Sequence, residues 1–282
     1  MANDYPKDPL TERVALVTGA NTGIGRVTAR ELARQGVHVF VACRAADRAA
    51  GVLADIRAAG GQGEFLALDL GDLDSVRHCA AAFLARGLPL HLLINNAGVA
   101  GGRGLTKSGF ELAFGTNHVG HFLLTQLLLE RLRASAPARI VTVSSRAHYR
   151  SPPIAWEALR QATRSRTGLP EYSVSKLANA LFNAELARRL AGTGVSCYTL
   201  HPGVVASDIW RHVPAPLRWL LKRFMITAED GAATTLHCAL SPAAGAETGL
   251  YYDLSKPRTP SRMAQDTALA AELWRRSEAW VA

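Results

Sequence analysis

The chain has 282 residues, 48% of them hydrophobic and 20% charged, which excludes global disorder and allows a sizeable buried core. The net charge of +9 comes from arginines scattered along the chain without a nucleic-acid-binding motif, so we expect a solvated basic surface and no nucleic-acid partner. The start, MANDYPKDPL, lacks a signal-peptide pattern, and no apolar run is long enough to span a bilayer. The widely spaced Cys43, Cys79, Cys197 and Cys238 indicate neither a metal site nor a disulfide framework, so we expect a cytoplasmic protein.

Strand-like and helix-like segments alternate along the chain. Apolar strands are predicted at residues 13–18, 37–42, 64–68, 91–95, 139–144 and 195–200, and a short last strand at 250–253. Helices are predicted at residues 26–35, 47–59, 73–85, 110–133, 171–190 and 229–240. Short strands separated by helices of this length indicate parallel strands with right-handed crossovers. The sequence therefore predicts an α/β fold with a doubly wound parallel sheet of about seven strands, helices on both faces, and one domain over residues 1–282.

A glycine-rich turn joins the first strand to the first helix. The segment reads Thr-Gly-Ala-Asn-Thr-Gly-Ile-Gly over residues 18–25. Gly19 would allow the tight turn, Gly23 a close approach of a pyrophosphate, and Gly25 close helix–strand packing. The helix N-terminus offers free N–H groups to the anion. This arrangement predicts a Rossmann-type dinucleotide site.

The end of the second strand indicates which dinucleotide binds. NAD-preferring sites usually carry an acidic residue there to hold the ribose hydroxyls. Here the segment reads Val-Ala-Cys-Arg over residues 41–44. The Arg44 guanidinium can clamp a 2′-phosphate, and Arg26 could add to the positive field. NADP(H) is therefore expected rather than NAD(H).

Tyr172 and Lys176 lie four residues apart in a predicted helix and therefore share a face. An ammonium beside a phenol favours the phenolate and lowers the pKa of the phenol, which suits a proton donor and acceptor. Ser145, at the end of the fifth strand, can bind the oxygen of a substrate. Asn117, in the long helix, could hold a water that connects Lys176 to solvent.

With these residues, the sequence resembles the short-chain dehydrogenase/reductase family and, within it, the subgroup of retinol dehydrogenases. The matching segments lie in the expected order over nearly the whole chain: residues 18–25, Asp69-Leu70, Asn95-Asn96-Ala97-Gly98, Asn117, Ser145, Tyr172 with Lys176, and His201-Pro202-Gly203. The subgroup is suggested by ANTGIG, VACR, TNHVGHFLLT, Ala147-His148 after VSS, and LHPGVV. The resemblance implies an Asn117–Ser145–Tyr172–Lys176 catalytic tetrad.

The resemblance also implies a set of residues around the cofactor. Residues from the turn, the strand ends and the segment after the sixth strand make up this set: Gly19, Asn21, Thr22, Gly23, Ile24, Gly25, Arg44, Asp69, Leu70, Asn95, Ala97, Gly98, Tyr172, Lys176, Pro202, Gly203, Val205 and Ser207. Asp69 would contact the adenine. The family commonly has threonine where Ser207 stands, and the hydroxyl is kept.

The expected reaction is hydride transfer between NADP(H) and an alcohol/carbonyl pair, with Tyr172 as acid and base. The substrate is expected to be small and apolar: retinol/retinal-like, steroid or another lipid-like carbonyl compound. A non-catalytic NADP(H)-binding sensor is the alternative. The mechanism needs no metal, and no histidine spacing supports one.

Three further features carry open alternatives. His118, His121 and His148 could either contact the substrate or serve packing. The helices at 110–133 and 171–190 carry broad apolar stripes, which either pair across a homodimer or homotetramer or are buried within the subunit. Residues 208–227 mix tryptophans and leucines with arginines. They are expected to form a substrate lid within residues 203–228, and peripheral membrane contact is compatible with that role.

Overall fold

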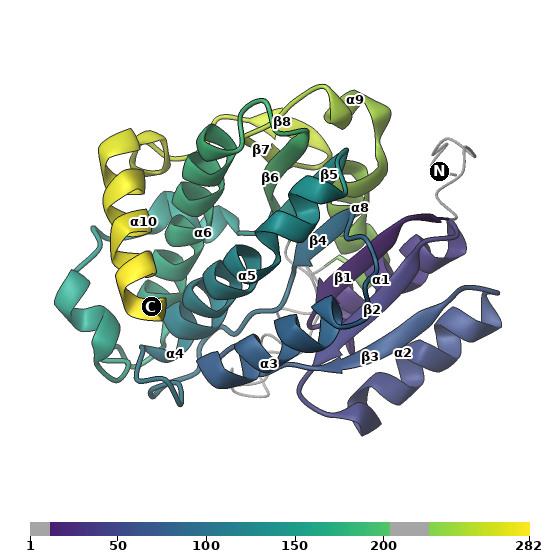
Figure 1. Cartoon of the computed structure of the whole chain (residues 1–282). Helices are drawn as coiled ribbons and strands as arrows, with labels where there is room; N and C mark the ends of the chain where they lie inside the picture. Colours follow the sequence, from purple (N-terminus) through teal and green to yellow (C-terminus); the bar gives the residue numbers. More distant parts are fainter. Residues whose placement is uncertain (1–11, 204–225) are drawn as a thin grey trace.

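The computed structural model of the protein describes residues 12–203 and 226–282. One sheet runs through it in the strand order β3-β2-β1-β4-β5-β6-β7-β8 (Figure 1). The strands are β1 Val14–Thr18, β2 His38–Cys43, β3 Gly63–Ala67, β4 Leu92–Asn95, β5 Ala138–Val143, β6 Val195–His201, β7 Leu250–Asp253 and β8 Lys256–Arg258. Neighbours are parallel except β7 and β8. The predicted doubly wound sheet is confirmed; the exposed three-residue β8, which has no apolar pattern, was not predicted.

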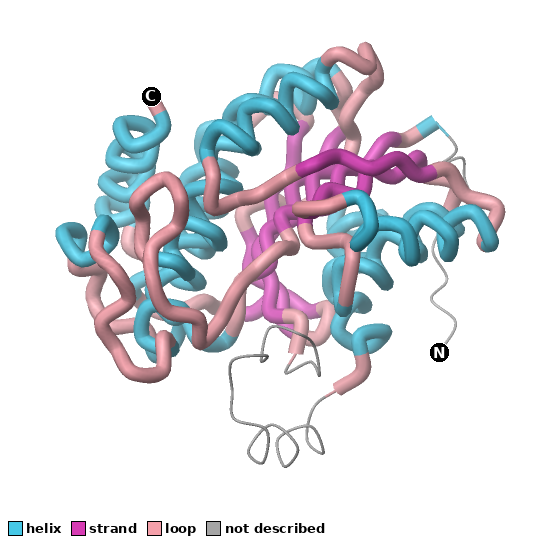
Figure 2. Tube along the Cα trace, turned by 90° about the horizontal axis from the view of Figure 1, so that it is seen from below, coloured by secondary structure: helices cyan, strands magenta, loops and turns pink. Residues whose placement is uncertain are grey.

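Helices cover both faces of the sheet (Figure 2). They are α1 Gly23–Arg34, α2 Ala46–Ala58, α3 Leu73–Leu84, α4 Leu112–Phe114, α5 Gly120–Ala134, α6 Leu169–Arg189, α8 Ala228–Leu240, α9 Pro242–Gly245 and α10 Thr267–Val281. One core cluster joins the sheet to α1, α2 and α8, and a second joins it to α3, α5, α6 and α10.

The strands supply apolar side chains to both clusters. Leu16 and Phe40 belong to the cluster under α3, α5 and α6, whereas Val17 and Val41 belong to the cluster under α1, α2 and α8. Side chains alternate along a strand, so a sheet covered on both faces needs continuous apolar runs. This requirement explains why the strands were recognisable in the sequence.

The long helix predicted at residues 110–133 is interrupted. A π-helical turn at Gly115–Val119 separates α4 from α5. Gly120 follows the π-helical turn, and only glycine fits there. A methyl group at this position would lie 2.4 Å from the carbonyl oxygen of Leu70. π-Helical turns occur frequently at functional sites, and this one contains Asn117.

The C-terminal helix α10 packs against α6 and was not predicted. Asp266 caps it by accepting a hydrogen bond from the Leu269 amide. Trp274, 4% exposed, stacks on Phe182 of α6 and meets Phe122 of α5 edge-on, with ring centroids 5.9 and 5.1 Å apart. Apolar side chains of α5 and α6 are thus buried within the subunit, while a homodimer or homotetramer stays a prediction.

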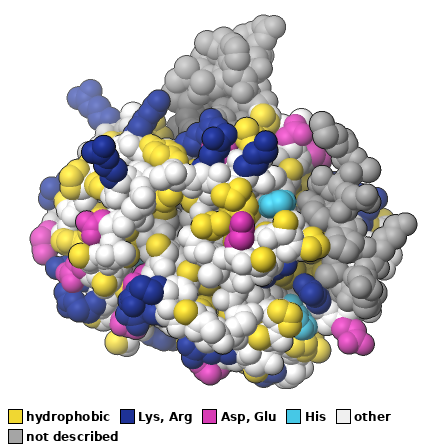
Figure 3. All heavy atoms as spheres, turned by 90° about the horizontal axis from the view of Figure 1, so that it is seen from above, with side chains coloured by type: hydrophobic (Ala, Val, Ile, Leu, Met, Phe, Trp, Pro, Cys, Tyr) yellow, Lys and Arg dark blue, Asp and Glu magenta, His cyan; other side chains and the backbone are white. Residues whose placement is uncertain are grey.

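Basic side chains are spread over the surface. Figure 3 shows Lys and Arg distributed around one face, with Asp and Glu between them. Several arginines pair with carboxylates, for example Arg275 and Arg276 with Glu272. Across residues 12–203 and 226–282, no helix combines the length and the apolarity needed to cross a bilayer.

Candidate active site

A cavity of about 1530 Å³ opens at the carboxyl ends of β1, β2, β4, β5 and β6. Ligands of open α/β sheets bind at this edge, where the strand order reverses. The volume exceeds the roughly 300–1,000 Å³ of a pocket for one drug-sized ligand. The cavity therefore has room for a dinucleotide together with a second molecule.

The glycine-rich turn forms one end of the cavity. Gly19 and Gly23 have φ angles of 65° and 54°, which favour glycine, and a methyl at Gly25 would lie 2.4 Å from the Gly19 carbonyl oxygen. All six predicted cofactor residues of the turn line the cavity: Gly19, Asn21, Thr22, Gly23, Ile24 and Gly25. The first turn of α1 contains no acidic residue. The backbone cradle and the helix N-terminus thus fit the pyrophosphate of a dinucleotide.

The loop after β4 is tied to this turn. Thr18 Oγ1 accepts hydrogen bonds from the Asn96 and Ala97 amides, both at 3.0 Å, and Asn96 Nδ2 donates to the Thr18 carbonyl at 2.8 Å. Asn96, Ala97 and Gly98 line the cavity. Asn95 does not: it is fully buried and donates to Thr125 Oγ1 at 3.1 Å. Of the predicted segment Asn95–Gly98, Asn95 does not face the cavity, because it still belongs to the strand and points into the core.

The opposite end of the cofactor region carries charge. Arg44, Asp69 and Leu70, which are predicted to bind the cofactor, line the cavity, and Arg48 of α2 joins them. Arg44 and Arg48 are exposed, and they lie four residues apart. Arg26 is not there, because its guanidinium pairs with Asp55 at 2.6 Å. Sequence reasoning missed Arg48, because Arg44 lies before the start of α2 and helical spacing does not relate the two residues.

Ser145 and Tyr172 meet beside the end of β5. Both side chains line the cavity, and the Ser145 hydroxyl is close enough to the Tyr172 hydroxyl to influence its pKa. Tyr172 is 8% exposed. Burial raises the pKa of its hydroxyl, and the Ser145 hydroxyl lowers it. The lowered pKa expected from Lys176 is therefore not what this structure gives, because burial has the larger effect.

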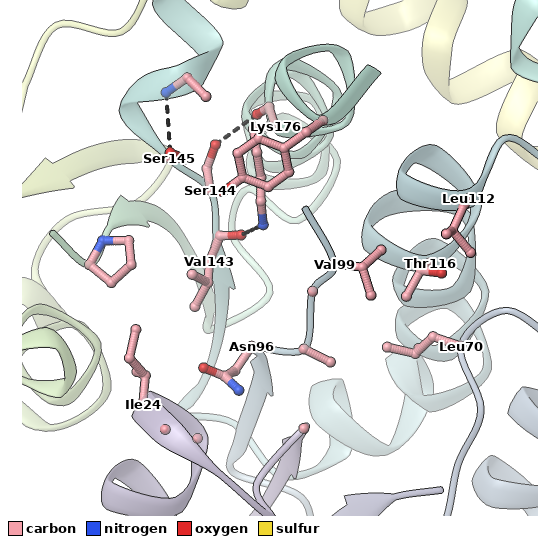
Figure 4. Close-up of a pocket in the computed structure, with 18 of the residues that line it drawn as sticks. Ile24, Leu70, Asn96, Val99, Leu112, Thr116, Val143, Ser144, Ser145 and Lys176 are labelled. Carbon is pink, nitrogen blue, oxygen red and sulfur yellow. Dashed lines mark hydrogen bonds between the residues drawn. The ribbon is translucent and has the colours of Figure 1, made fainter. Parts of the chain in front are cut away.

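Lys176 lies behind Tyr172 on the same face of α6. Its Nζ is 5.7 Å from the centre of the Tyr172 ring and donates to the Val143 carbonyl at 2.8 Å (Figure 4). Burial lowers the pKa of the Lys176 ammonium to about 7. Lysine in this environment can gain and lose a proton near neutral pH.

Asn117 is buried behind the loop that follows β4. Its Oδ1 accepts from the Val99 amide at 2.8 Å, and its Nδ2 donates to the Val99 carbonyl and to Ser175 Oγ. A methyl at Gly98 would lie 3.4 Å from Asn117 Oδ1 and 3.6 Å from Lys176 Nζ, so both side chains reach the same glycine. Asn117 therefore fixes this loop beside Lys176, and the relay water stays a prediction.

The histidines divide into two groups. His118, His121 and His148 are buried and do not line the cavity, which favours the packing alternative over substrate contact. His201 does line it, with Pro202 and Gly203, and burial lowers the pKa of its imidazole to about 4. The predicted cofactor residues Val205 and Ser207 and most of the proposed lid lie outside the described residues.

The remaining wall of the cavity combines a group of apolar side chains with charged ones, among them Lys107, Arg146 and Arg150. Val99, Leu112 and Thr116 lie along one side of it, with Leu70 of the cofactor region beside them (Figure 4). Further apolar side chains that sequence reasoning missed complete this region: Leu105, Ala147, Tyr149, Pro152, Leu169 and Pro170. They come from the loop after β4, the segment after β5 and the first turn of α6, whose relative positions depend on the fold. This end of the cavity fits an apolar molecule next to Ser145 and Tyr172.

The doubly wound sheet, the glycine cradle and the Ser–Tyr–Lys group together define a dinucleotide-dependent oxidoreductase. The family model for short chain dehydrogenases matches residues 13–217. Human retinol dehydrogenase 12 is 46% identical over 270 residues, covering 94% of this chain and 85% of the relative. Bovine dehydrogenase/reductase SDR family member 13 is 43% identical over 287 residues, covering 95% and 73%. The chain belongs to the short-chain dehydrogenase/reductase family, as an oxidoreductase related to the retinol dehydrogenases, which confirms the predicted resemblance.

Solved structures agree with this placement. A crystal structure of an uncharacterized protein from Mycobacterium paratuberculosis matches with a TM-score of 0.78 and 37% identity, covering 99% of this chain and 96% of that one. A short chain dehydrogenase from Burkholderia cenocepacia in complex with NADP matches with a TM-score of 0.69 and 26% identity, covering 87% and 97%. These neighbours share the fold, and the second binds NADP.

Proposed function

We propose that the chain is an NADP(H)-dependent oxidoreductase that interconverts an apolar alcohol and its aldehyde or ketone. The observation that carries the proposal is that Ser145 and Tyr172 line the same cavity, with Lys176 behind Tyr172, where the apolar side chains and the glycine-rich end of the cavity meet. A positioned phenol is the acid/base that such a reaction needs.

The preference for NADP(H) rests on the charge around the end of β2. Two exposed guanidiniums, Arg44 and Arg48, line the cavity there, and residue 43 is a cysteine instead of a carboxylate. Arginine pairs well with phosphate oxygens. We propose that these arginines hold the 2′-phosphate, while the turn residues, Asp69, Leu70, Ala97, Gly98, Pro202 and Gly203 hold the rest of the dinucleotide.

A bound nicotinamide dinucleotide supplies the hydride in reduction and accepts it in oxidation. The hydroxyls of Ser145 and Tyr172 bind the substrate oxygen, and Tyr172 gives a proton to that oxygen or takes one from it. Lys176, whose Nζ lies 5.7 Å from the centre of the Tyr172 ring and has a pKa near 7, would hold a proton close to this site between turnovers. Asn117 keeps the loop beside Lys176 in place through its bonds to Val99.

The substrate end favours a long apolar carbonyl compound. Leu105, Leu112 and Leu169 line it, and Leu105 and Leu169 are 48% and 42% exposed at its rim. Retinol dehydrogenases are relatives of this chain, so retinol and retinal head the candidates, followed by steroid and other lipid-like carbonyls. We also propose a reducing, cytoplasmic setting, supported by four separate buried thiols.

The test is a screen of NADPH oxidation with aldehydes and ketones of increasing apolar size, retinal and a steroid ketone included, with Tyr172→Phe as the blank. We expect turnover with at least one long apolar carbonyl in the parent and almost none in the variant. No turnover across the panel would favour a non-catalytic NADP(H)-binding protein and would contradict the proposal.

A further inference from the structure

His148 is a fully buried histidine three residues after Ser145, and the proposed chemistry does not use it. It lies in the 3₁₀ turn Arg146–Arg150, which Ser145 caps. Its ring packs against Tyr149 and Tyr251, with centroids 4.0 and 4.8 Å away. A polar ring buried this deeply needs partners for both nitrogens.

Both ring nitrogens have backbone partners that fix the tautomer. Nδ1 lies 2.6 Å from the Ser145 carbonyl oxygen, and Nε2 lies 3.1 Å from the Ser261 amide nitrogen. A carbonyl can only accept a hydrogen bond and an amide N–H can only donate one. His148 therefore carries its proton on Nδ1 and accepts at Nε2, and only the neutral ring satisfies both partners.

Through these two hydrogen bonds, His148 connects the 3₁₀ turn Arg146–Arg150 to Ser261, which follows β8 more than 100 residues later. Two neighbouring contacts span the same gap: the Tyr149 hydroxyl donates to the Thr259 carbonyl at 2.5 Å, and Arg146 pairs with Asp253 of β7 at 2.7 Å. The turn is thus held by the C-terminal part of the sheet as well as by β5.

The position of the Ser145 hydroxyl depends on this turn. Its Oγ accepts from the Ala147 amide at 3.2 Å, and its backbone carbonyl accepts from the His148 amide and from Nδ1. A rotation of the Ser145 peptide would move Oγ relative to Tyr172. Displacement of a reacting group by about 1 Å can cost about 100-fold in rate.

We propose that His148 is a positioning residue for Ser145: as the neutral Nδ1–H tautomer it ties the Ser145 carbonyl to the Ser261 amide, so the segment after β8 becomes part of the active-site framework. The proposal rests on the proposed function, because it gives Ser145 a substrate-binding hydroxyl to hold in place.

Three substitutions separate the two hydrogen bonds. His148→Asn keeps a donor in the place of Nδ1, His148→Gln keeps an acceptor in the place of Nε2, and His148→Phe keeps the ring and neither bond. We expect kcat to fall about 10- to 100-fold in the Phe and Gln variants and to recover substantially in the Asn variant. The KM for NADPH should stay within about threefold, because His148 does not line the cavity.

Tyr251→Phe is the matched control. It keeps the ring that packs on His148 and removes a hydroxyl that has no hydrogen-bond partner, so kcat should be unchanged. If His148→Phe is folded and keeps kcat within twofold of the parent, the proposal is wrong. Equal activity of the Asn and Gln variants would also overturn it, because a merely structural ring would not distinguish them.

Nitrogen-15 NMR of the imidazole, with amide exchange at Ser261, tests the geometry without turnover. We expect a neutral Nδ1–H ring at pH 7 and a protected Ser261 amide that exchanges faster in His148→Phe. An Nε2–H or a doubly protonated ring would overturn the proposal. These measurements do not depend on the substrate, so their failure is distinguishable from failure of the proposed function.

Discussion

Replacing Lys176 by methionine is expected to abolish turnover without weakening the fold at neutral pH. Lys176 is 2% exposed, and burial lowers its pKa from 10.5 to about 7. Methionine is similarly long and apolar, so it can fill the same space. The Val143 carbonyl loses the bond from Nζ but keeps the bond from Asn179 Nδ2 at 3.2 Å. The variant should therefore remove a costly buried charge while leaving that carbonyl satisfied.

The size of the effect follows from the pKa of Lys176. Between about pH 7 and pH 10.5 the unfolded chain holds a proton on Lys176 that the folded chain has released. The free energy of unfolding of the parent therefore rises with pH across this window. This gain in stability is complete above about pH 10.5 and is lost again as the pH falls back through about 7. A window of about 3.5 pH units at ~1.4 kcal/mol per unit gives about 5 kcal/mol as an upper limit.

Urea unfolding of parent and Lys176→Met at pH 7, 8, 9 and 10, without added cofactor, measures this difference. The variant should be the more stable protein at pH 7, and its advantage should shrink by several kcal/mol towards pH 10. Other groups titrate in both proteins, so they cancel in the difference. A difference that stays flat within about 1 kcal/mol would refute the lowered pKa of Lys176 and the role built on it.

Three further substitutions test the cofactor end and the packing of α10. Arg44→Asp should raise the KM for NADPH at least about 10-fold and the KM for NADH much less, because it replaces a phosphate partner by a repelling charge. The prediction is contradicted if the parent prefers NADH and its kinetics are unchanged by the substitution. Gly25→Ala should cost about 1–3 kcal/mol in thermal unfolding and weaken NADPH binding, because the methyl meets the Gly19 carbonyl at 2.4 Å; unchanged values argue against the cradle. Trp274→Ala should lower the free energy of unfolding by about 3–5 kcal/mol, because its ring is buried against Phe182, and a loss below about 1 kcal/mol would show that α10 adds little.

The parts of the site that were predictable have local causes. The glycines of the turn stand at fixed offsets because each position has its own steric demand, seen at Gly19 and Gly25. Tyr172 and Lys176 were placed correctly on one face of a helix, because helix geometry brings residues i and i+4 together. The strands were recognisable because the sheet is covered on both sides and needs apolar runs.

The parts that were missed depend on tertiary contacts. Asn95 and Asn96 are adjacent in sequence, and only the end of β4 decides that the first enters the core and the second faces the cavity. The lowered pKa predicted for Tyr172 assumed an ammonium beside the hydroxyl, whereas Lys176 donates to the Val143 carbonyl, a backbone partner that no side-chain pattern reveals. The packing of α10 on α6 likewise joins segments far apart in the chain.

The most direct test of the central claim is the single-turnover rate of Tyr172→Phe with NADPH and the best carbonyl substrate of the parent. Phenylalanine keeps the ring and removes only the hydroxyl that meets Ser145. The account predicts that NADPH still binds and that the rate of carbonyl reduction falls at least ~10²-fold, the scale of one positioned acid/base. A variant that reduces the carbonyl at nearly the parental rate would contradict the assignment of Tyr172.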